Sequence, residues 1–236
     1  DATTGVLSIS PPQKALYQHH YGTPDARFVS LPPGIRRDRV QPADHLHRRT
    51  VLRAELGISE VTPMLLFVGS GFRTKGLDRA LQALAGLPGD ARLFVVGEDK
   101  AAPYQRQARR LGLEGRVHFM GGRDDVPAWL WAADLLVHPA YAENTGTVLL
   151  EAAIAGLPVL TTRACGYADY IRDADLGRVL DDPTPESLAA AARELLALDR
   201  PAWWEKAARF AEQADIYSLT DHAVDAIEGE PPGAGQ

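Results

Sequence analysis

The sequence is poor in cysteine, has no long apolar run and carries no excess of basic residues. Cys165 is its single cysteine, so no intramolecular disulfide can form, and this usage is typical of a reducing compartment. No stretch approaches the ~18 consecutive apolar residues of a membrane-spanning helix. The net charge of −6 argues against a dedicated nucleic-acid-binding protein.

What is present is an ordinary globular composition with an alternating pattern. The chain has 236 residues, of which 45% are hydrophobic and 24% charged, and this length corresponds to one or two domains. Short apolar runs alternate with segments of helical period such as 77–87 and 104–111. The predicted strands are residues 64–69, 93–97, 117–120, 134–138 and 158–161. We therefore expect an α/β fold with a doubly wound parallel sheet, in which ligands bind at the carboxyl ends of the strands.

The two ends of the chain differ from this pattern. Residues 1–35 contain strand-like runs at 5–10 and 27–31 around a helical run at 11–21, too little for an independent core. Because the chain also opens without a methionine, we expect a piece of a longer protein. The last helix is predicted at 217–228, followed by a disordered tail over 231–236.

An arginine-rich stretch follows the first segment. It contains Arg36, Arg37, Arg39, Arg48, Arg49 and Arg53. We interpret it as a solvated linker and helix face, with contact to an anionic surface as the alternative.

Two glutamates form the strongest candidate feature. Glu143 lies in the loop after the strand 134–138, and Glu151 lies on the second turn of an apolar helix that begins near 145–147. A carboxylate on a buried helix is costly unless it is hydrogen-bonded. Glu151 is therefore either a ligand for hydroxyl groups at the cleft wall or a structural residue satisfied by backbone or an arginine.

The start of that helix is a candidate anion site. Its residues are small or polar: Asn144, Thr145, Gly146 and Thr147. Unpaired N–H groups and the helix dipole at such a terminus suit a phosphate. The alternative is that these residues only cap the helix.

The loop over residues 70–76 carries Arg73 and Lys75 among glycines that include Gly71. A positive, close-fitting loop at a strand end suits a diphosphate leaving group, although both cations could simply be solvated. The glycine spacings of a P-loop and of a dinucleotide-binding turn are absent, which argues against a hydride-transfer enzyme.

Other candidates carry less information. The backbone at Gly122 and Arg123 follows a predicted strand and could pair with the edge of a base, or form a plain turn. His138 ends a strand at the cleft, as a core or wall residue. The histidines lack metal-ligand spacing, so no metal site is expected.

Three motifs resemble the retaining GT-B glycosyltransferases of family 4. Glu143 and Glu151 match the E-x7-E motif of that family. Residues 67–76 match its V-G-R-x4-K-G loop, except that Ser70 replaces the arginine. Residues 165–171 match G-G-x-x-E-x-I, with Asp169 in place of the glutamate. Within the family, residues 31–35, 66–78, 93–100, 138–141 and 161–170 resemble the enzymes that add the first glucose to the inner-core heptose of lipopolysaccharide.

The resemblance implies a division of the chain. Residues 36–215 would form the Rossmann-like, nucleotide-sugar (donor) half of a two-domain enzyme. Residues 1–35 would be a remnant of the amino-terminal acceptor domain with the linker. The helix in residues 216–236 would cross back to that domain.

The resemblance also implies roles for single residues. Glu143 would hold hydroxyl groups of the donor glucose, with the backbone of Asn144, Thr145 and Gly146, and Glu151 would bind the ribose. The diphosphate would be bound by Lys75, Arg73, the Gly71 loop and the amides of Thr147 and Val148, and uracil by the backbone of Gly122 and Arg123.

The implied partners are UDP-glucose or UDP and, through the amino-terminal domain, the lipopolysaccharide core. No metal would be required, and the enzyme would work in the cytoplasm at the inner face of the membrane. Two alternatives stay open: a family 4 transferase with another nucleotide sugar or acceptor, and a non-catalytic nucleotide-binding module.

Overall fold

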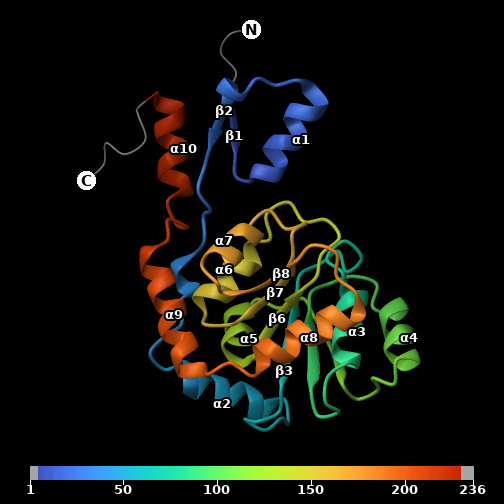
Figure 1. Ribbon diagram of the computed structural model, residues 1–236. Coiled ribbons are helices and arrows are strands. Elements are labelled where there is room, and N and C mark those ends of the chain that lie inside the picture. The colour runs from blue at the N-terminus through green and yellow to red at the C-terminus, as the bar shows by residue number, and fades with distance from the viewer. Residues whose placement is uncertain (1–4, 230–236) are drawn as a thin grey trace.

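The computed structural model describes residues 5–229 and contains a six-stranded parallel sheet with helices on both faces (Figure 1). The strands of this sheet are β3 (Met64–Val68), β4 (Arg92–Val96), β5 (Val117–Gly121), β6 (Leu135–His138), β7 (Val159–Thr162) and β8 (Gly177–Leu180). Their order is β5-β4-β3-β6-β7-β8. The five predicted strands are confirmed as β3 to β7, whereas the edge strand β8 was not predicted.

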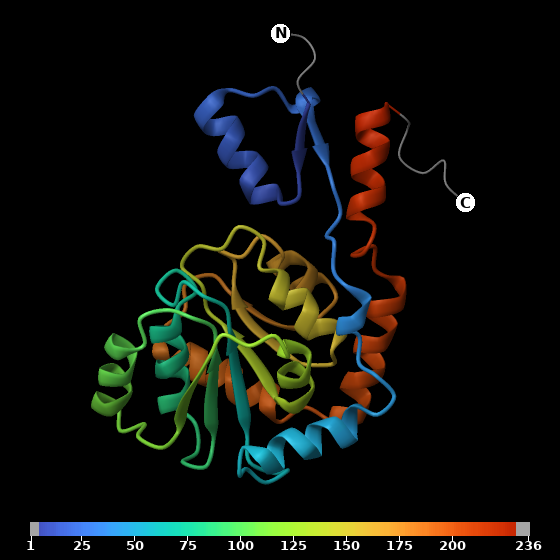
Figure 2. The same ribbon diagram turned by 180° about the vertical axis from the view of Figure 1, so that it is seen from behind.

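The helices divide into two layers because the strand residues alternate between two cores. Leu65 and Phe67 face one core, and Met64 and Leu66 face the other. The first core is covered by α3 (Leu77–Ala85), α4 (Ala102–Arg110) and α8 (Pro185–Leu196). The second is covered by α5 (Val126–Ala132), α6 (Thr147–Ile154), α7 (Ala168–Asp173) and α9 (Arg200–Gln213), with α2 (His45–Glu55) at its margin (Figure 2).

The amino-terminal segment forms a small separate layer. It consists of β1 (Val6–Ser8), α1 (Pro11–Tyr21), a 3-10 turn η1 (Asp25–Arg27) and β2 (Phe28–Ser30), with β1 and β2 paired in parallel. A second turn, η2 (Arg37–Arg39), lies in the linker. This matches the strand, helix and strand expected there, while residues 1–4 lie outside the described part of the chain. That the segment belongs to a preceding domain stays a prediction.

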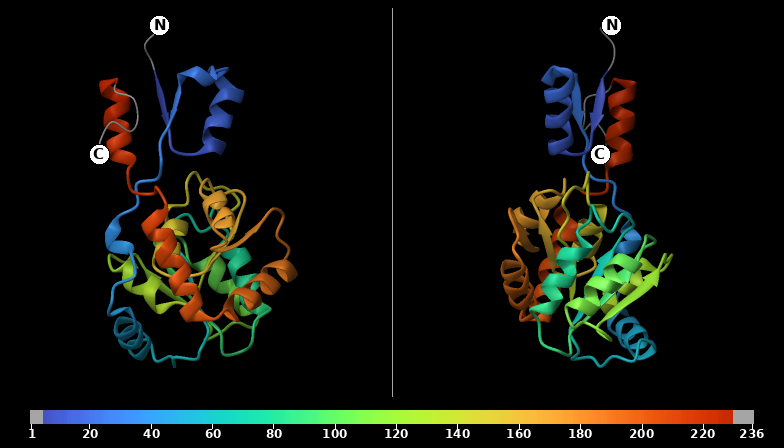
Figure 3. Two further views of the ribbon diagram at one scale, coloured as in Figure 1. Left: turned by 60° about the vertical axis from the view of Figure 1, so that its left-hand side comes forward. Right: turned by 90° about the vertical axis from the view of Figure 1, so that its right-hand side faces the viewer.

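The last helix, α10 (Leu219–Glu228), rises beside this segment (Figure 3). The chain just before this helix is anchored by the Ile35 N–H, which donates to the carbonyl of Ile216 at 2.8 Å. The helix side chains Val224 and Ile227 are exposed. The expected crossing of this helix to an amino-terminal domain stays a prediction, and the expected tail over 231–236 lies outside the described residues.

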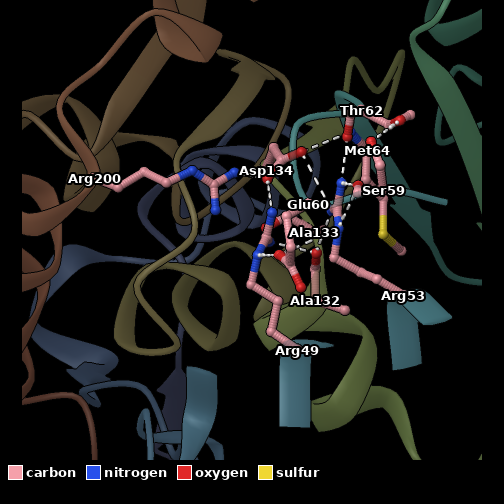
Figure 4. Close-up of polar contacts among 10 residues, drawn as sticks. All are labelled: Arg49, Arg53, Ser59, Glu60, Thr62, Met64, Ala132, Ala133, Asp134 and Arg200. Atoms are coloured by element: carbon pink, nitrogen blue, oxygen red, sulfur yellow. Dashed lines mark hydrogen bonds and ion pairs between the residues drawn. The ribbon is translucent and has the colours of Figure 1, made fainter. Parts of the chain in front are cut away.

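Two arginines of the basic stretch are buried, which corrects the expectation of a solvated helix face. Arg49 and Arg53 on α2 are 4% and 1% exposed. Both bond to the carboxylate of Asp134, at 2.7 and 3.4 Å, and Arg200 of α9 contacts the same group (Figure 4). The Met64 N–H donates to Asp134 as well, at 2.7 Å. The cluster therefore ties α2 and α9 to the amino ends of β3 and β6.

Candidate functional site

The loops after β3 and β6 are joined because these strands are neighbours in the sheet. The N–H groups of Tyr141 and Ala142 donate to the carbonyl of Thr74 at 2.8 and 3.2 Å. Gly76 has a left-handed φ of +77°, and a Cβ there would lie 2.2 Å from the carbonyl oxygen of Pro139. A glycine is therefore needed where the two loops cross.

Lys75 and Glu143 form an ion pair at this crossing. Their side chains are 22% and 15% exposed. Gly69 makes room for the lysine, since a Cβ at that position would lie 2.8 Å from the Lys75 Cε. The Glu143 N–H donates to the carbonyl of Ala164 at 3.2 Å, which fixes the loop that carries the carboxylate. The backbone thus places both predicted charges against each other.

His138 adds to the electrostatics of this pair. Its Nε2 lies 3.5 Å from Oε2 of Glu143, the oxygen that Lys75 also contacts. The imidazole and then the lysine outweigh the effect of burial and lower the pKa of Glu143 to about 2. Burial lowers the pKa of His138. At neutral pH the site therefore combines a carboxylate, an ammonium group and a neutral imidazole.

An open groove of about 630 Å³ lies beside the ion pair. One side is formed by α1, and the other by the two crossed loops. Its lining residues are Pro12, Gln13, Leu16, Ser70, Thr74, Lys75, Tyr141, Ala142, Glu143, Asn144 and Ala164. Lys75, Glu143 and Asn144 are thus three predicted site residues that the fold brings into one groove.

The start of α6 has no side-chain cap. The helix begins at Thr147 after Gly146, whose φ of +75° is left-handed, and no side chain in the described part of the chain accepts from the first-turn amides. The Thr145 carbonyl accepts from the Tyr167 N–H at 2.8 Å. Gly146 caps the helix through its backbone, because its carbonyl accepts from the Leu149 N–H at 2.9 Å, so the alternative of a plain cap stays open beside the anion site at the amides of Thr147 and Val148. Their contact with a phosphate stays a prediction.

Glu151 has an arginine partner. The Arg39 Nε donates to Oε1 of Glu151 at 3.2 Å, and the two side chains are 18% and 17% exposed. The interpretation of Glu151 as a carboxylate satisfied by arginine is thus met in this structure. Its binding to ribose stays a prediction.

Arg73 and Gly71 do not line the groove with Lys75. Arg73 is exposed and has no hydrogen bond or ion pair through its side chain within residues 5–229. The carbonyl of Gly71 accepts from the Thr74 hydroxyl at 3.0 Å, which stabilises the turn. The joint action of Arg73 and Lys75 on a diphosphate stays a prediction.

Gly122 and Arg123 follow β5, an outermost strand of the sheet, at its carboxyl end. Arg123 pairs with Asp125 at 2.7 Å and lies over the ring of Trp129. A Cβ on Gly122 would lie 3.2 Å from the side chain of Glu98 in the loop after β4. The side chain of Arg123 is therefore engaged locally, and the pairing of this backbone with a base stays a prediction.

Sequence reasoning did not find Arg39 as the partner of Glu151, nor α1 as a wall of the groove. Neither has a local signal, because each depends on a contact between segments far apart in the chain. No group of histidine, cysteine and carboxylate side chains suited to a metal occurs within residues 5–229. No helix in the same range is long and apolar enough to cross a membrane.

The family described as "Glycosyl transferases group 1" matches residues 48–216, which include both β-loop segments of the groove and the whole sheet. The chain belongs to this glycosyltransferase family. The Rossmann-like α/β fold expected from the resemblance is confirmed, and it matches solved GT-B structures.

Individual relatives support the same assignment. The chain is 46% identical to the lipopolysaccharide glucosyltransferase WaaG of Escherichia coli, over 96% of this chain and 63% of the relative. It therefore spans less than two thirds of that relative's length. A crystal structure of WaaG superposes with a TM-score of 0.87 at 45% identity, covering 94% of this chain and 62% of the other. The structure of Anabaena Alr3699/HepE in complex with UDP-glucose has a TM-score of 0.85 at 22% identity and covers 96% and 64% of the two chains, and it shows a shared fold.

Proposed function

We propose that this chain binds UDP-glucose and supplies the donor half of a retaining glucosyltransferase acting on the inner-core heptose of lipopolysaccharide. The observation that carries the proposal is the pair of Lys75 and Glu143 in a groove at the carboxyl ends of β3 and β6. The similarity to WaaG supports glucose and lipopolysaccharide as the substrates.

In this proposal the donor rearranges the ion pair. The diphosphate attracts the ammonium of Lys75, and the first-turn amides of α6 provide further donors for its oxygens. Glu143, whose pKa lies well below neutral pH in the free groove, then accepts hydrogen bonds from the glucose hydroxyls as a carboxylate. Glu151 binds the ribose, and the backbone after β5 binds uracil. Lysine and helix terminus supply the positive charge that stabilises the leaving group, so that no metal ion is required.

We further propose that the acceptor binds through an amino-terminal domain. The E. coli relative is longer than the segment matched here, which leaves room for such a domain. The complete protein would then work in the cytoplasm, at the inner face of the membrane that holds the lipid-linked acceptor. This chain alone should bind the donor but transfer glucose poorly or not at all.

Calorimetric titration of the 236-residue chain tests the donor. UDP, UDP-glucose, UDP-galactose and GDP-mannose are compared on the wild type and on the Glu143→Gln variant. We expect UDP-glucose to bind the wild type most tightly of the three sugar nucleotides, and the variant to lose affinity for the sugar nucleotide but not for UDP. Preference for another sugar nucleotide would indicate a different donor. Binding of none of the four would refute the proposal and favour a module that binds another partner.

A further inference from the structure

His138, the last residue of β6, is completely buried and has no use in the function proposed above. Neither of its ring nitrogens has a hydrogen bond of good geometry within residues 5–229. Buried polar groups without partners are rare in folded proteins and costly, so each needs a physical explanation.

The surroundings of the ring fix its direction. One face lies parallel to the ring of Phe67, with centroids 6.1 Å apart and planes 19° apart. The Thr161 hydroxyl donates to the His138 carbonyl at 3.0 Å and fixes the backbone. The Nε2 atom then points to Glu143, whose Oε2 is 3.5 Å away. A shift of a few tenths of an ångström by the carboxylate would complete a hydrogen bond.

Lys75 and His138 converge on the same oxygen of Glu143. Lysine is the mobile partner, because it reaches the carboxylate on a flexible chain and is 22% exposed, whereas the histidine is rigid. An anionic ligand in the groove would draw the ammonium away from the glutamate. The Glu143 carboxylate would then keep His138 as its remaining partner.

Burial lowers the pKa of His138, Glu143 raises it and Lys75 lowers it, and the histidine stays neutral among three other titratable groups. These are Glu143, Lys75 and Cys165, whose Sγ lies 3.2 Å from the Thr161 hydroxyl oxygen. Burial lowers the pKa of His138 and raises the pKa of the Cys165 thiol, so both are uncharged at neutral pH. A neutral imidazole offers one N–H, and the nitrogen facing the carboxylate is Nε2.

We propose that His138 is a positioning residue that donates its Nε2–H to Glu143 and keeps this carboxylate aimed at the sugar when Lys75 moves to the diphosphate. This inference rests on the proposed function, because it takes the ligand to be a nucleotide diphosphate sugar. It adds a residue that acts only through Glu143 and therefore affects the binding of the sugar but not the binding of the nucleotide.

The first test compares three variants by calorimetry with UDP and UDP-glucose. His138→Phe keeps a ring against Phe67 but has no donor, and His138→Gln restores an N–H. His118→Phe is the matched control, because His118 on β5 is also stacked on a phenylalanine, at 4.8 Å from Phe94, but lies away from the ion pair. We expect His138→Phe to bind UDP-glucose about tenfold more weakly, as for the loss of a hydrogen bond to a charged group. UDP affinity should change less than about twofold, His138→Gln should recover most of the loss, and His118→Phe should match the wild type.

The second test needs no variant and therefore holds even if His138→Phe does not fold. Nitrogen-15 spectra of the histidine rings report which nitrogen carries the proton. We expect a neutral Nε2–H form for His138 between pH 6 and 8, with a slowly exchanging proton in the UDP-glucose complex. An Nδ1–H form or a charged ring in that complex would overturn the inference. Equal loss of UDP and UDP-glucose affinity in His138→Phe would overturn it too, since it would indicate a general packing role. Failure of the wild type to bind either nucleotide would instead refute the proposed function.

Discussion

Replacing Asp134 by asparagine should destabilise the fold strongly, because three arginines surround this one carboxylate. The Asp134 side chain is 6% exposed, and those of Arg49 and Arg53 are 5% and 1% exposed. Glu60 is the other acid near them, at 3.2 Å from Arg49, but its side chain is half exposed. Without the charge of Asp134, the cluster would keep three guanidinium groups and one solvated carboxylate.

The magnitude follows from the burial of these groups. Removing one partner of a buried ion pair costs about 3–5 kcal/mol, because the remaining charge stays buried without compensation. Burial lowers the pKa of Arg53 to about 10 in the wild type, and because arginines in proteins keep their proton at neutral pH, its charge stays in the cluster of the variant. For a chain of this size, the same loss corresponds to a decrease of about 6–20 °C in melting temperature.

The assay is urea unfolding at pH 7, followed by tryptophan fluorescence, with Asp181→Asn as the matched control. Asp181 also pairs with an arginine, Arg163, but the two side chains are 68% and 62% exposed. Its loss should cost at most about 1 kcal/mol. If Asp134→Asn lost no more free energy of unfolding than Asp181→Asn, the cluster would not stabilise the docking of α2 and α9, and the reasoning would be wrong.

Three further outcomes are expected. Lys75→Gln should weaken UDP binding by about tenfold or more in calorimetry, because a charge-assisted contact with the diphosphate is lost; unchanged affinity would exclude that role. The folded-state pKa of Glu143 is lowered to about 2 from 4.5, so its ionised form stabilises the fold above pH 4.5 and this contribution disappears as the pH falls through about 2. The wild type should therefore lose roughly 3 kcal/mol more than Glu143→Gln between pH 5 and 2 in acid-dependent unfolding, and parallel curves would contradict this. Gly76→Ala should cost clearly more stability than Gly115→Ala in thermal unfolding, because both positions have positive φ but only the first places a Cβ 2.2 Å from a backbone oxygen; equal losses would mean that the loop crossing is not tight.

The parallel sheet could be predicted from the sequence because strands buried on both faces are continuous apolar runs that end at glycine or a polar residue. β8 was not predicted, because it has no such continuous apolar run. It is an edge strand with Arg178 at its centre, and only its first residue is buried. The burial of Arg49 and Arg53 could not be predicted either, because their common partner Asp134 is more than 80 residues away and lies at the start of a strand.

The candidate site was predicted by position, not by contact. Strand ends placed Lys75 and Glu143 at one edge of the sheet, and the structure joins them directly. Strand ends do not tell which way a loop side chain points. Arg73 is two residues from Lys75 yet exposed and outside the groove, because the turn that Thr74 closes separates the two side chains.

Glu151 can both pair with an arginine and bind hydroxyl groups, because its carboxylate has two oxygen atoms. Arg39 donates its Nε to one carboxylate oxygen, Oε1, and Oε2 has no hydrogen bond within residues 5–229. A carboxylate can accept several hydrogen bonds through its two oxygens, so the arginine compensates the buried charge and leaves acceptor capacity for hydroxyl groups. Arg39 lies in η2, on the linker between the amino-terminal segment and the sheet domain. A movement of that linker would therefore change the orientation of the glutamate that we propose binds the ribose.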